Sequence, residues 1–305
     1  IGYTDRWSAA PGEHIALHGS GTAHTIALDI VRVRHGDPNP SGPGLRIESV
    51  ESDIEGSYPV AKQSIHAGSH AILSAESAGA PASTISIWVW TLRPSAGNTQ
   101  ALVARGGLAL YLDPAGVPSA RIGDVVIAGE APLPAERWHR FELHLGSEAQ
   151  LSIDGAVVAQ VDASVEPPSG AVTLAAELDS EGVPTDLFNG RLEELCLDGR
   201  VFDVRDLELI NAPTVAVTGR HWDDDTTDFR GAPEQYAAVH FHEDDLEDAQ
   251  WPVTATYTVP PDLPSGIYAF RMRAGELVDH VPFVVTPPRG TATASIGFLL
   301  PTLTY

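Results

Sequence analysis

The sequence of 305 residues contains a single cysteine, Cys196, and a single lysine, Lys62. One thiol excludes an intramolecular disulfide and any metal site built from several cysteines. So few thiols are typical of a protein in a reducing compartment, and we therefore expect a cytoplasmic location.

Positive charge is scarce as well. The chain has 18 Lys and Arg residues against 41 Asp and Glu residues, a formal net charge of −23. Such a surface repels the phosphates of nucleic acids and of anionic membranes, so we expect neither as a partner. The sequence also lacks an apolar run of about 18 residues and a basic, then apolar leader, so we expect no membrane-spanning helix and no secretion signal.

The dominant pattern is an alternation of apolar and polar residues with a period of two. It is clear at Leu108–Leu112, Phe141–Leu145, Val253–Val259 and Tyr268–Arg273, and Asp154-Gly155 is a typical hairpin turn between two such runs. Alternation of this kind indicates strands with one face on a core and one toward water. The sequence therefore predicts an all-β protein built from sandwiches.

Two stretches depart from this pattern. The best helix candidate is Glu243–Gln250. In Ile26–Val33 the alternation changes phase, which a bulge near Asp29–Val31 explains, as does a strand that continues from one sheet to another.

The strands fall into three segments. Residues 1–60 and 206–290 each hold too few strands for a sandwich, whereas residues 61–205 hold enough for a complete domain. We predict that the first and third segments pair into one discontinuous sandwich, with the middle domain inserted, and the alternative is two or three domains in series. The tail 291–305 is apolar, and we expect it to lead into a further domain of a longer polypeptide or to be buried against a partner.

The middle segment resembles a known fold family, the concanavalin-A-like or laminin-G-like jelly roll, over about 140 residues. The resemblance rests on a tryptophan strand, an Arg-Trp strand, an Ile-Asp-Gly hairpin and a closing strand, at Ile85–Trp90, Arg137–Leu143, Leu151–Gly155 and Phe188–Leu195. This fold hosts both lectins and enzymes, so the resemblance implies a fold and not a function.

The flanking segments resemble a second family, the N-terminal region of the large (β) subunit of N,N-dimethylformamidase. The residues that carry the resemblance lie in order along both flanks, at Gly2–Glu13, Val31–Gly44, His240–Trp251, Val259–Ala269 and Ala294–Tyr305. With this resemblance, the leading fold is an immunoglobulin-like sandwich interrupted by the jelly roll.

The second resemblance implies an amidohydrolase that cleaves N,N-dimethylformamide to dimethylamine and formate. It also implies a small subunit, a hetero-oligomer, and a mononuclear iron held by tyrosine and glutamate in an α/β domain that follows this segment. No residue of this chain, Tyr305 included, matches an iron ligand, so we expect no catalytic, cofactor or metal residue here.

Two acidic clusters are candidate metal sites. His240 and His242 lie two apart, on one face of a strand, and Asp244 follows, which is a possible set for a divalent metal. The alternative is that this stretch caps or forms a short helix. Asp223–Asp225 is a candidate calcium loop or, more simply, a solvated acidic loop.

Other candidates belong to enzymes and lectins. Glu193, Glu194 and Asp198 are the nearest acids for glycoside hydrolysis, but a Glu-x-Asp-x-Glu strand is absent. Trp88 and Trp90 share a face, either as core or as a sugar platform.

The last two candidates have mainly structural interpretations. Cys196 is interpreted as a small core residue and not as a nucleophile. The loop His35–Pro40 is interpreted as rigid support, with a contact to another domain or subunit as the alternative.

The leading hypothesis is a non-catalytic N-terminal scaffold of a dimethylformamidase-like enzyme, whose partners are its own catalytic domain and a small subunit. A carbohydrate-binding module is the alternative, and a glycoside hydrolase is a third interpretation.

Overall fold

The structure, a computed structural model, describes residues 1–162, 164–225, 228–292 and 294–299. Strands dominate, as predicted, and the helices of the described residues are short: α1 (Ala75–Ala78), η1 (Val204–Asp206) and η2 (Pro233–Tyr236). Within those residues, none of the helices has the length and hydrophobicity that crossing a bilayer requires.

The chain divides into two compact units. Unit 1 comprises Ile1–Ser64 and Gln250–Tyr305, and unit 2 comprises Ile65–Ala249. The division expected from sequence differs, because it assigned residues 206–249 to the flanking sandwich. In the structure these residues supply strands to both sheets of unit 2, since β21 (Glu208–Ile210) pairs with β7 (His70–Leu73) and β23 (Ala238–Phe241) pairs with β19 (Gly190–Leu197).

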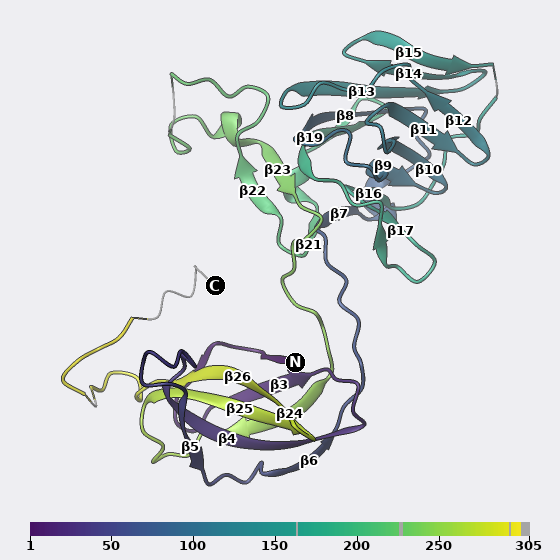
Figure 1. Cartoon of the computed structure of the whole chain (residues 1–305). Coiled ribbons are helices and arrows are strands. Elements are labelled where there is room, and N and C mark those ends of the chain that lie inside the picture. The colour runs from purple at the N-terminus through teal and green to yellow at the C-terminus, as the bar shows by residue number, and fades with distance from the viewer. Residues whose placement is uncertain (163, 226–227, 293, 300–305) are drawn as a thin grey trace. The chain divides into compact units, whose positions relative to one another are not determined.

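Unit 1 contains two sheets (Figure 1). The larger sheet has the order β2 (Ser8–Ala9), β26 (Leu277–Val285), β25 (Gly266–Ala274), β4 (Thr25–His35) and β5 (Arg46–Val50), and β6 (Gly56–Pro59) also pairs with β4. The smaller sheet has the order β1 (Gly2–Thr4), β3 (His14–Gly19) and β24 (Val253–Thr258). One core lies between them and includes Leu17, Tyr257, Phe270 and Phe283.

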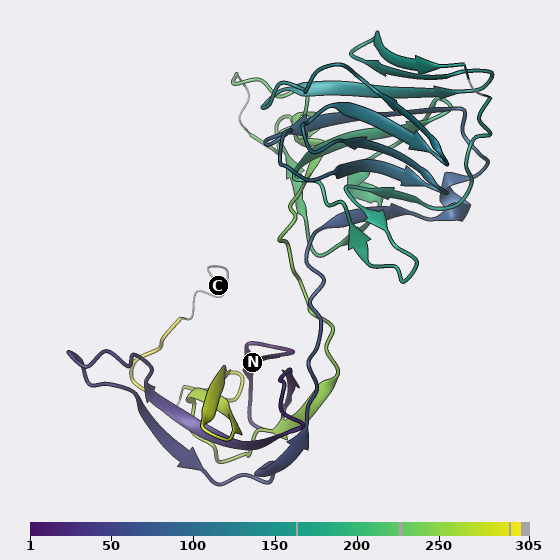
Figure 2. The ribbon, with the colours of Figure 1, turned by 45° about the vertical axis from the view of Figure 1, so that its right-hand side comes forward.

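Unit 2 has two larger sheets that face each other, as the turned view shows (Figure 2). The seven-stranded sheet has the order β12 (Val125–Ala128), β11 (Pro118–Ile122), β10 (Leu108–Leu112), β9 (Gln100–Arg105), β16 (Val172–Leu174), β7 and β21. The eight-stranded sheet has the order β15 (Ala156–Val161), β14 (Ala149–Ile153), β13 (Trp138–Leu145), β8 (Thr84–Thr91), β19, β23 and β22 (Thr214–Val217), and β20 (Arg200–Phe202) pairs with β19. A small hairpin joins β17 (Glu177–Leu178) to β18 (Pro184–Thr185).

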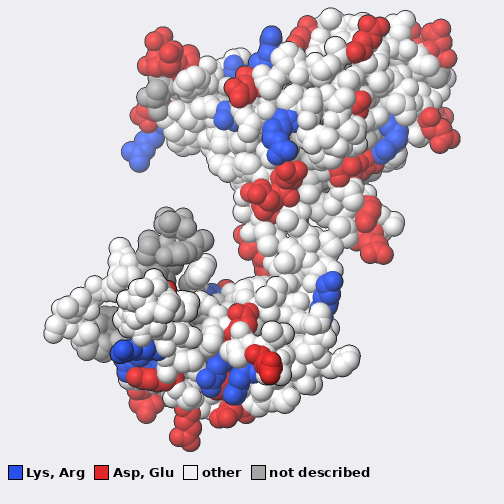
Figure 3. Space-filling model, viewed as in Figure 1, with Lys and Arg blue, Asp and Glu red and all other residues white. Residues whose placement is uncertain are grey.

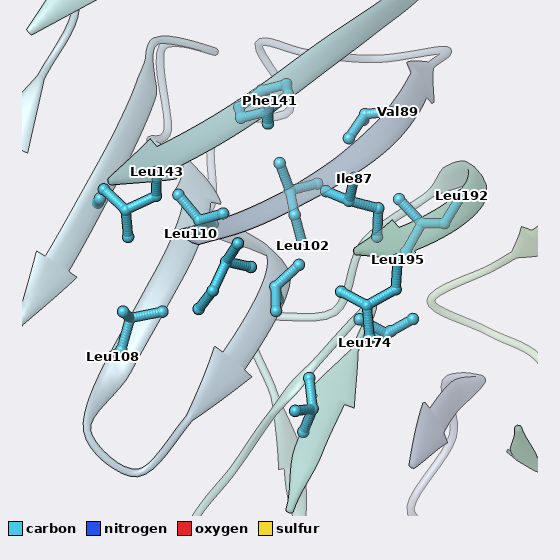
Figure 4. Close-up of a cluster of buried hydrophobic side chains, with 14 of the residues drawn as sticks. Ile87, Val89, Leu102, Leu108, Leu110, Phe141, Leu143, Leu174, Leu192 and Leu195 are labelled. Atoms are coloured by element: carbon cyan, nitrogen blue, oxygen red, sulfur yellow. The ribbon is translucent and has the colours of Figure 1, made fainter. Parts of the chain in front are cut away.

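The core of unit 2 is mainly aliphatic. Ile87, Phe141 and Leu195 from the eight-stranded sheet point toward Leu102 and Leu110 of the seven-stranded sheet (Figure 4). Burying such side chains contributes about 1.5–3 kcal/mol each, which is the main force that holds the two sheets together.

The predictions of a turn, a helix and a bulge have different outcomes. The Asp154-Gly155 turn joins β14 to β15, with φ of 53° and 81°, values that a primed hairpin turn requires. The predicted helix at Glu243–Gln250 is wrong, because these residues form turns and irregular backbone. In β4 the phase change coincides with a change of partner from β6 to β5, and the register shift against β5 lies between Val33 and His35 instead of near Asp29–Val31.

Candidate functional site

The outer face of the eight-stranded sheet gathers aromatic and basic side chains. Trp90 of β8 lies between Trp138 of β13 and Arg191 of β19, and Arg191 in turn pairs with His240 of β23. All four residues are half-buried. Because alternate residues of a strand face opposite sides, Ile87 and Val89 enter the core while Trp88 and Trp90 point away from it. The interpretation of these tryptophans as core residues is therefore wrong.

Two guanidinium groups stack on these tryptophans. The Arg191 guanidinium carbon lies 4.4 Å from the centroid of the Trp90 ring, and that of Arg220 lies 4.9 Å from Trp88. Cation–π contacts of this kind contribute about 0.5–2 kcal/mol, more when water is excluded. One face of each indole is thus occupied by the chain itself.

Glu193 is nearly fully buried, with 4% of its surface exposed, and its partner is Arg220. Its Oε2 accepts a hydrogen bond of 2.8 Å from the Arg220 backbone N–H, and the Arg220 side chain lies 3.6 Å from Oε1. Arg220 also donates to Glu194 over 2.6 Å. Asp198 accepts two backbone N–H bonds, from Ser83 and Thr84. The carboxylates considered for glycoside hydrolysis thus bind Arg220 and the backbone.

A bulge in β19 sets the direction of these side chains. Glu194 has a φ of 54°, and the register against β8 shifts between Glu193 and Cys196. The extra residue restores the inward phase at Leu195 and leaves Cys196 half-buried on the outer side, paired with Ser86. Cys196 is therefore not the core residue expected from sequence.

The histidine cluster is present, but its carboxylate is Asp245. The rings of His240 and His242 lie 4.1 Å apart, and His242 Nδ1 lies 3.1 Å from Asp245 Oδ2. Ser69 donates to the same oxygen over 2.6 Å. Asp244, the carboxylate proposed from sequence, is exposed.

His240 has the most strongly shifted pKa of this face. Burial, reinforced by the neighbouring His242 and Arg191, lowers its pKa to about 4, and Asp245 opposes the shift. The imidazole is therefore neutral near pH 7. Its Nε2 atom is buried and has no hydrogen-bond partner.

The structure does not bring the candidate metal ligands into one group. Within the part of the chain that the structure describes, no group of three or more His, Cys, Asp or Glu side chains is arranged to hold a metal ion. Tyr305 lies outside the described residues.

Side chains of the remaining candidate loops form hydrogen bonds that hold these loops in place. Asp223 accepts bonds from the Asp225 N–H and the Gln235 side chain, at 3.0 and 2.9 Å, and the loop continues into residues 226–227, outside the described part. In unit 1, His35 Nδ1 lies 2.9 Å from the Gly44 carbonyl oxygen, and Asp37 accepts from the Asn39 N–H.

Sequence reasoning missed the arginines of this face. Arg191 directly precedes Leu192 in an alternating strand, so its outward direction was readable, but its contact with Trp90 required the strand order β8–β19. Arg220 belongs to the loop after β22, and nothing in its local sequence indicates a contact with Trp88.

Comparison with known proteins shows a similarity to the dimethylformamidase β subunit. A family model described as "N,N-dimethylformamidase beta subunit-like, C-terminal" matches residues 214–305. The N,N-dimethylformamidase β subunits of Alcaligenes sp and Paracoccus aminophilus are each 28% identical to the chain, over 393 and 392 aligned residues, and the alignments cover 100% of this chain.

The chain resembles the N-terminal region of the dimethylformamidase β subunit. This confirms the resemblance predicted from the two flanking segments. The chain spans about half the length of these relatives, since the alignments cover 51% of each dimethylformamidase subunit.

Solved structures are more distant. A pentraxin from Limulus polyphemus matches with 11% identity and a TM-score of 0.33, covering 55% of this chain and 74% of the pentraxin. A putative carbohydrate-binding protein from Bacteroides ovatus matches with 11% identity and a TM-score of 0.34, covering 93% of this chain and 99% of that protein. TM-scores below 0.5 do not bear on function, so the dimethylformamidase similarity alone informs it.

Proposed function

We propose that this chain is the scaffold part of a dimethylformamidase-like amidohydrolase, whose reaction converts an amide and water into an amine and formate. The observation that carries the proposal is the similarity to two dimethylformamidase β subunits along the entire chain. We place the catalytic iron in the part of the subunit that these 305 residues do not include.

The chemistry of the described residues supports a scaffold. A general acid, base or nucleophile must be within reach of a substrate and poised for proton transfer. Glu193 is instead buried against Arg220, and His242 is bound to Asp245. Glu193 holds Arg220 against the sheet, and Asp245 holds the segment after β23, so both contacts have a structural role. We therefore derive no catalytic step from this chain.

The partners follow from the same proposal. The similar proteins are named as β subunits, which supports a hetero-oligomeric enzyme. We propose that this chain packs on the catalytic domain of its own subunit and contributes to contacts with a smaller subunit, in the cytoplasm.

A sugar-binding role is not favoured by the face described here. Sugars stack on open aromatic rings, whereas Arg191 and Arg220 lie over Trp90 and Trp88. A polysaccharide pull-down that retained the chain would support that alternative.

The test is intact mass spectrometry of the protein purified from its natural host, together with iron analysis of the same sample. The proposal predicts a polypeptide heavier than 32.3 kDa or a co-purifying chain, with bound iron and with release of dimethylamine from N,N-dimethylformamide. A preparation without iron that leaves N,N-dimethylformamide intact would contradict it.

A further inference from the structure

Arg191 is a half-buried cation that lacks a carboxylate partner among the described residues, although the chain has 41 acidic side chains. Burial lowers the pKa of its guanidinium, and no neighbouring carboxylate offsets that shift. Other arginines of this face are paired: Arg140 with Glu142, and Arg220 with Glu193 and Glu194. A desolvated charge without a counterion is unfavourable, and a bound anion relieves the cost.

One nitrogen of the guanidinium has hydrogen-bond partners, and another is buried without one. Nη1 donates to the Thr218 carbonyl oxygen over 3.1 Å and to its hydroxyl over 2.5 Å. Nε, on the opposite edge, is buried and has no partner. An arginine edge with its parallel N–H groups matches the two oxygens of a carboxylate.

His240 supplies a second donor without a partner when the proton of its neutral imidazole is on Nε2. It is the cross-strand neighbour of Arg191, and its Nε2 is also buried and unbonded. Trp90 lies beside both residues, with the guanidinium carbon 4.4 Å from its ring centroid and the His240 ring 6.4 Å away, edge to face. Two donors against an aromatic wall form a site for a small planar anion.

We propose that Arg191 and His240 form a carboxylate-binding site on the outer face of the eight-stranded sheet, with Trp90 as its wall. A single negative charge suits this site, because the net charge of −23 disfavours multiply charged anions such as phosphate. Since both atoms are buried, binding requires the groups that cover them to move. The carboxylate belongs either to a free small acid such as formate or to an acidic side chain of another protein. The site does not depend on the proposed amidohydrolase.

The groups that act on His240 make it a reporter of the site. Arg191 and His242 oppose its protonation and Asp245 favours it. A carboxylate bound beside the ring favours protonation as well, and therefore raises the pKa of His240 from about 4.

The experiment is an NMR titration of the whole chain with sodium formate at pH 6.5, following the Arg191 Nε–H and His240 ring signals, with sodium chloride at equal ionic strength as reference. We expect saturable shifts with formate alone and, in pH titrations run with and without formate, a rise of at least about one unit in the pKa of His240. Equal shifts with chloride, or no shifts with any carboxylate, would overturn the site.

Substitutions test whether Arg191 binds the carboxylate. Arg191→Gln is expected to weaken binding at least tenfold, whereas Arg137→Gln, which removes an equal charge from an exposed position, leaves it unchanged. Arg191→Lys keeps the cation without the fork and is expected to weaken binding several-fold, which covers the case in which Arg191→Gln unfolds. Binding of Arg191→Lys at the wild-type affinity would overturn the bidentate assignment.

A second titration uses a short peptide with blocked ends and a single glutamate to distinguish the two sources of the carboxylate. Peptide binding at least tenfold tighter than formate supports an acidic segment of another protein as the ligand. Formate binding as tight or tighter supports a free small acid. Failure of both ligands overturns the proposal, whatever the enzymatic activity of the whole protein.

Discussion

At the scale of single residues, Glu193 and Arg220 show how the loop after β22 is attached to the eight-stranded sheet. The buried carboxylate accepts the Arg220 N–H while the guanidinium stacks on Trp88, so one residue of the loop is bound through its backbone and its side chain. Removing either partner leaves a buried polar group unsatisfied, which is the costly outcome.

Glu193→Ala is therefore expected to lower the free energy of unfolding by about 1–3 kcal/mol. Urea denaturation of the purified chain measures the change. Glu148→Ala removes the same charge from an exposed position and should stay within about 0.5 kcal/mol of wild type. Equal effects of the two substitutions would show that the Glu193–Arg220 contact does not stabilise unit 2.

A second residue-scale prediction concerns Gly219. A β-carbon there would lie 2.4 Å from Glu193 Oε2, so Gly219→Ala must displace the buried carboxylate and is expected to cost about 1–3 kcal/mol. Gly146→Ala is the matched control, because its added methyl group meets no heavy atom within 4 Å. Thermal unfolding of both variants makes the comparison, and an unchanged midpoint for Gly219→Ala would contradict the packing.

The third residue-scale prediction follows from the low pKa of His240. The unfolded chain protonates this ring near pH 6.5 and the folded chain near 4, so the unfolded state binds more protons between these values. Stability must then fall as the pH decreases from about 6.5 to 4, by about 1–3 kcal/mol from this residue, and stay level above 6.5. Urea midpoints across this range should vary less in His240→Gln; an equal slope in both proteins would refute the shift.

At the scale of elements, alternation predicted strands well and their partners poorly. Phe141–Leu145 and Leu108–Leu112 are strands with the expected faces inward, because a period of two is a property of the local sequence. The strand order β13–β8–β19–β23 places Arg191 beside His240, and this pairing joins segments about 50 residues apart. Long-range pairing of this kind leaves no local signal, so the candidate site was only partly predictable.

Helix prediction at Glu243–Gln250 failed for a related reason. Acidic residues at the start of a helix are a weak preference, and tertiary contacts override it. Asp245 binds His242 and Ser69 and accepts the Gly68 N–H, so this segment is held against the start of unit 2 instead of coiling.

The strands β21–β23 decide where unit 2 ends. A fragment of residues 65–249 is expected to unfold in one cooperative transition, since it keeps both sheets complete. A fragment of residues 61–205 lacks β21, β22 and β23 and exposes buried side chains such as Leu192 and Val204, so we expect it to aggregate or to lack a transition. Circular dichroism melts of the two fragments compare them, and equal cooperativity would place the boundary near 205.

At the scale of the whole molecule, negative charge is distributed over both units, as the visible face shows (Figure 3). Positive charge is rarer, and several arginines are paired, as in the bidentate contact of Arg271 with Asp29 in unit 1. A highly charged acidic surface keeps proteins from associating nonspecifically, which is compatible with the proposed scaffold role.

The most direct test of the scaffold role is dimethylamine release from N,N-dimethylformamide, measured side by side for residues 1–305 alone and for the complete enzyme purified with its small subunit. The account predicts release by the complete enzyme and none by the 305-residue chain, with iron only in the former. Release by residues 1–305 alone would place catalysis in this chain and contradict the scaffold, and no release by the complete enzyme would contradict the amidohydrolase.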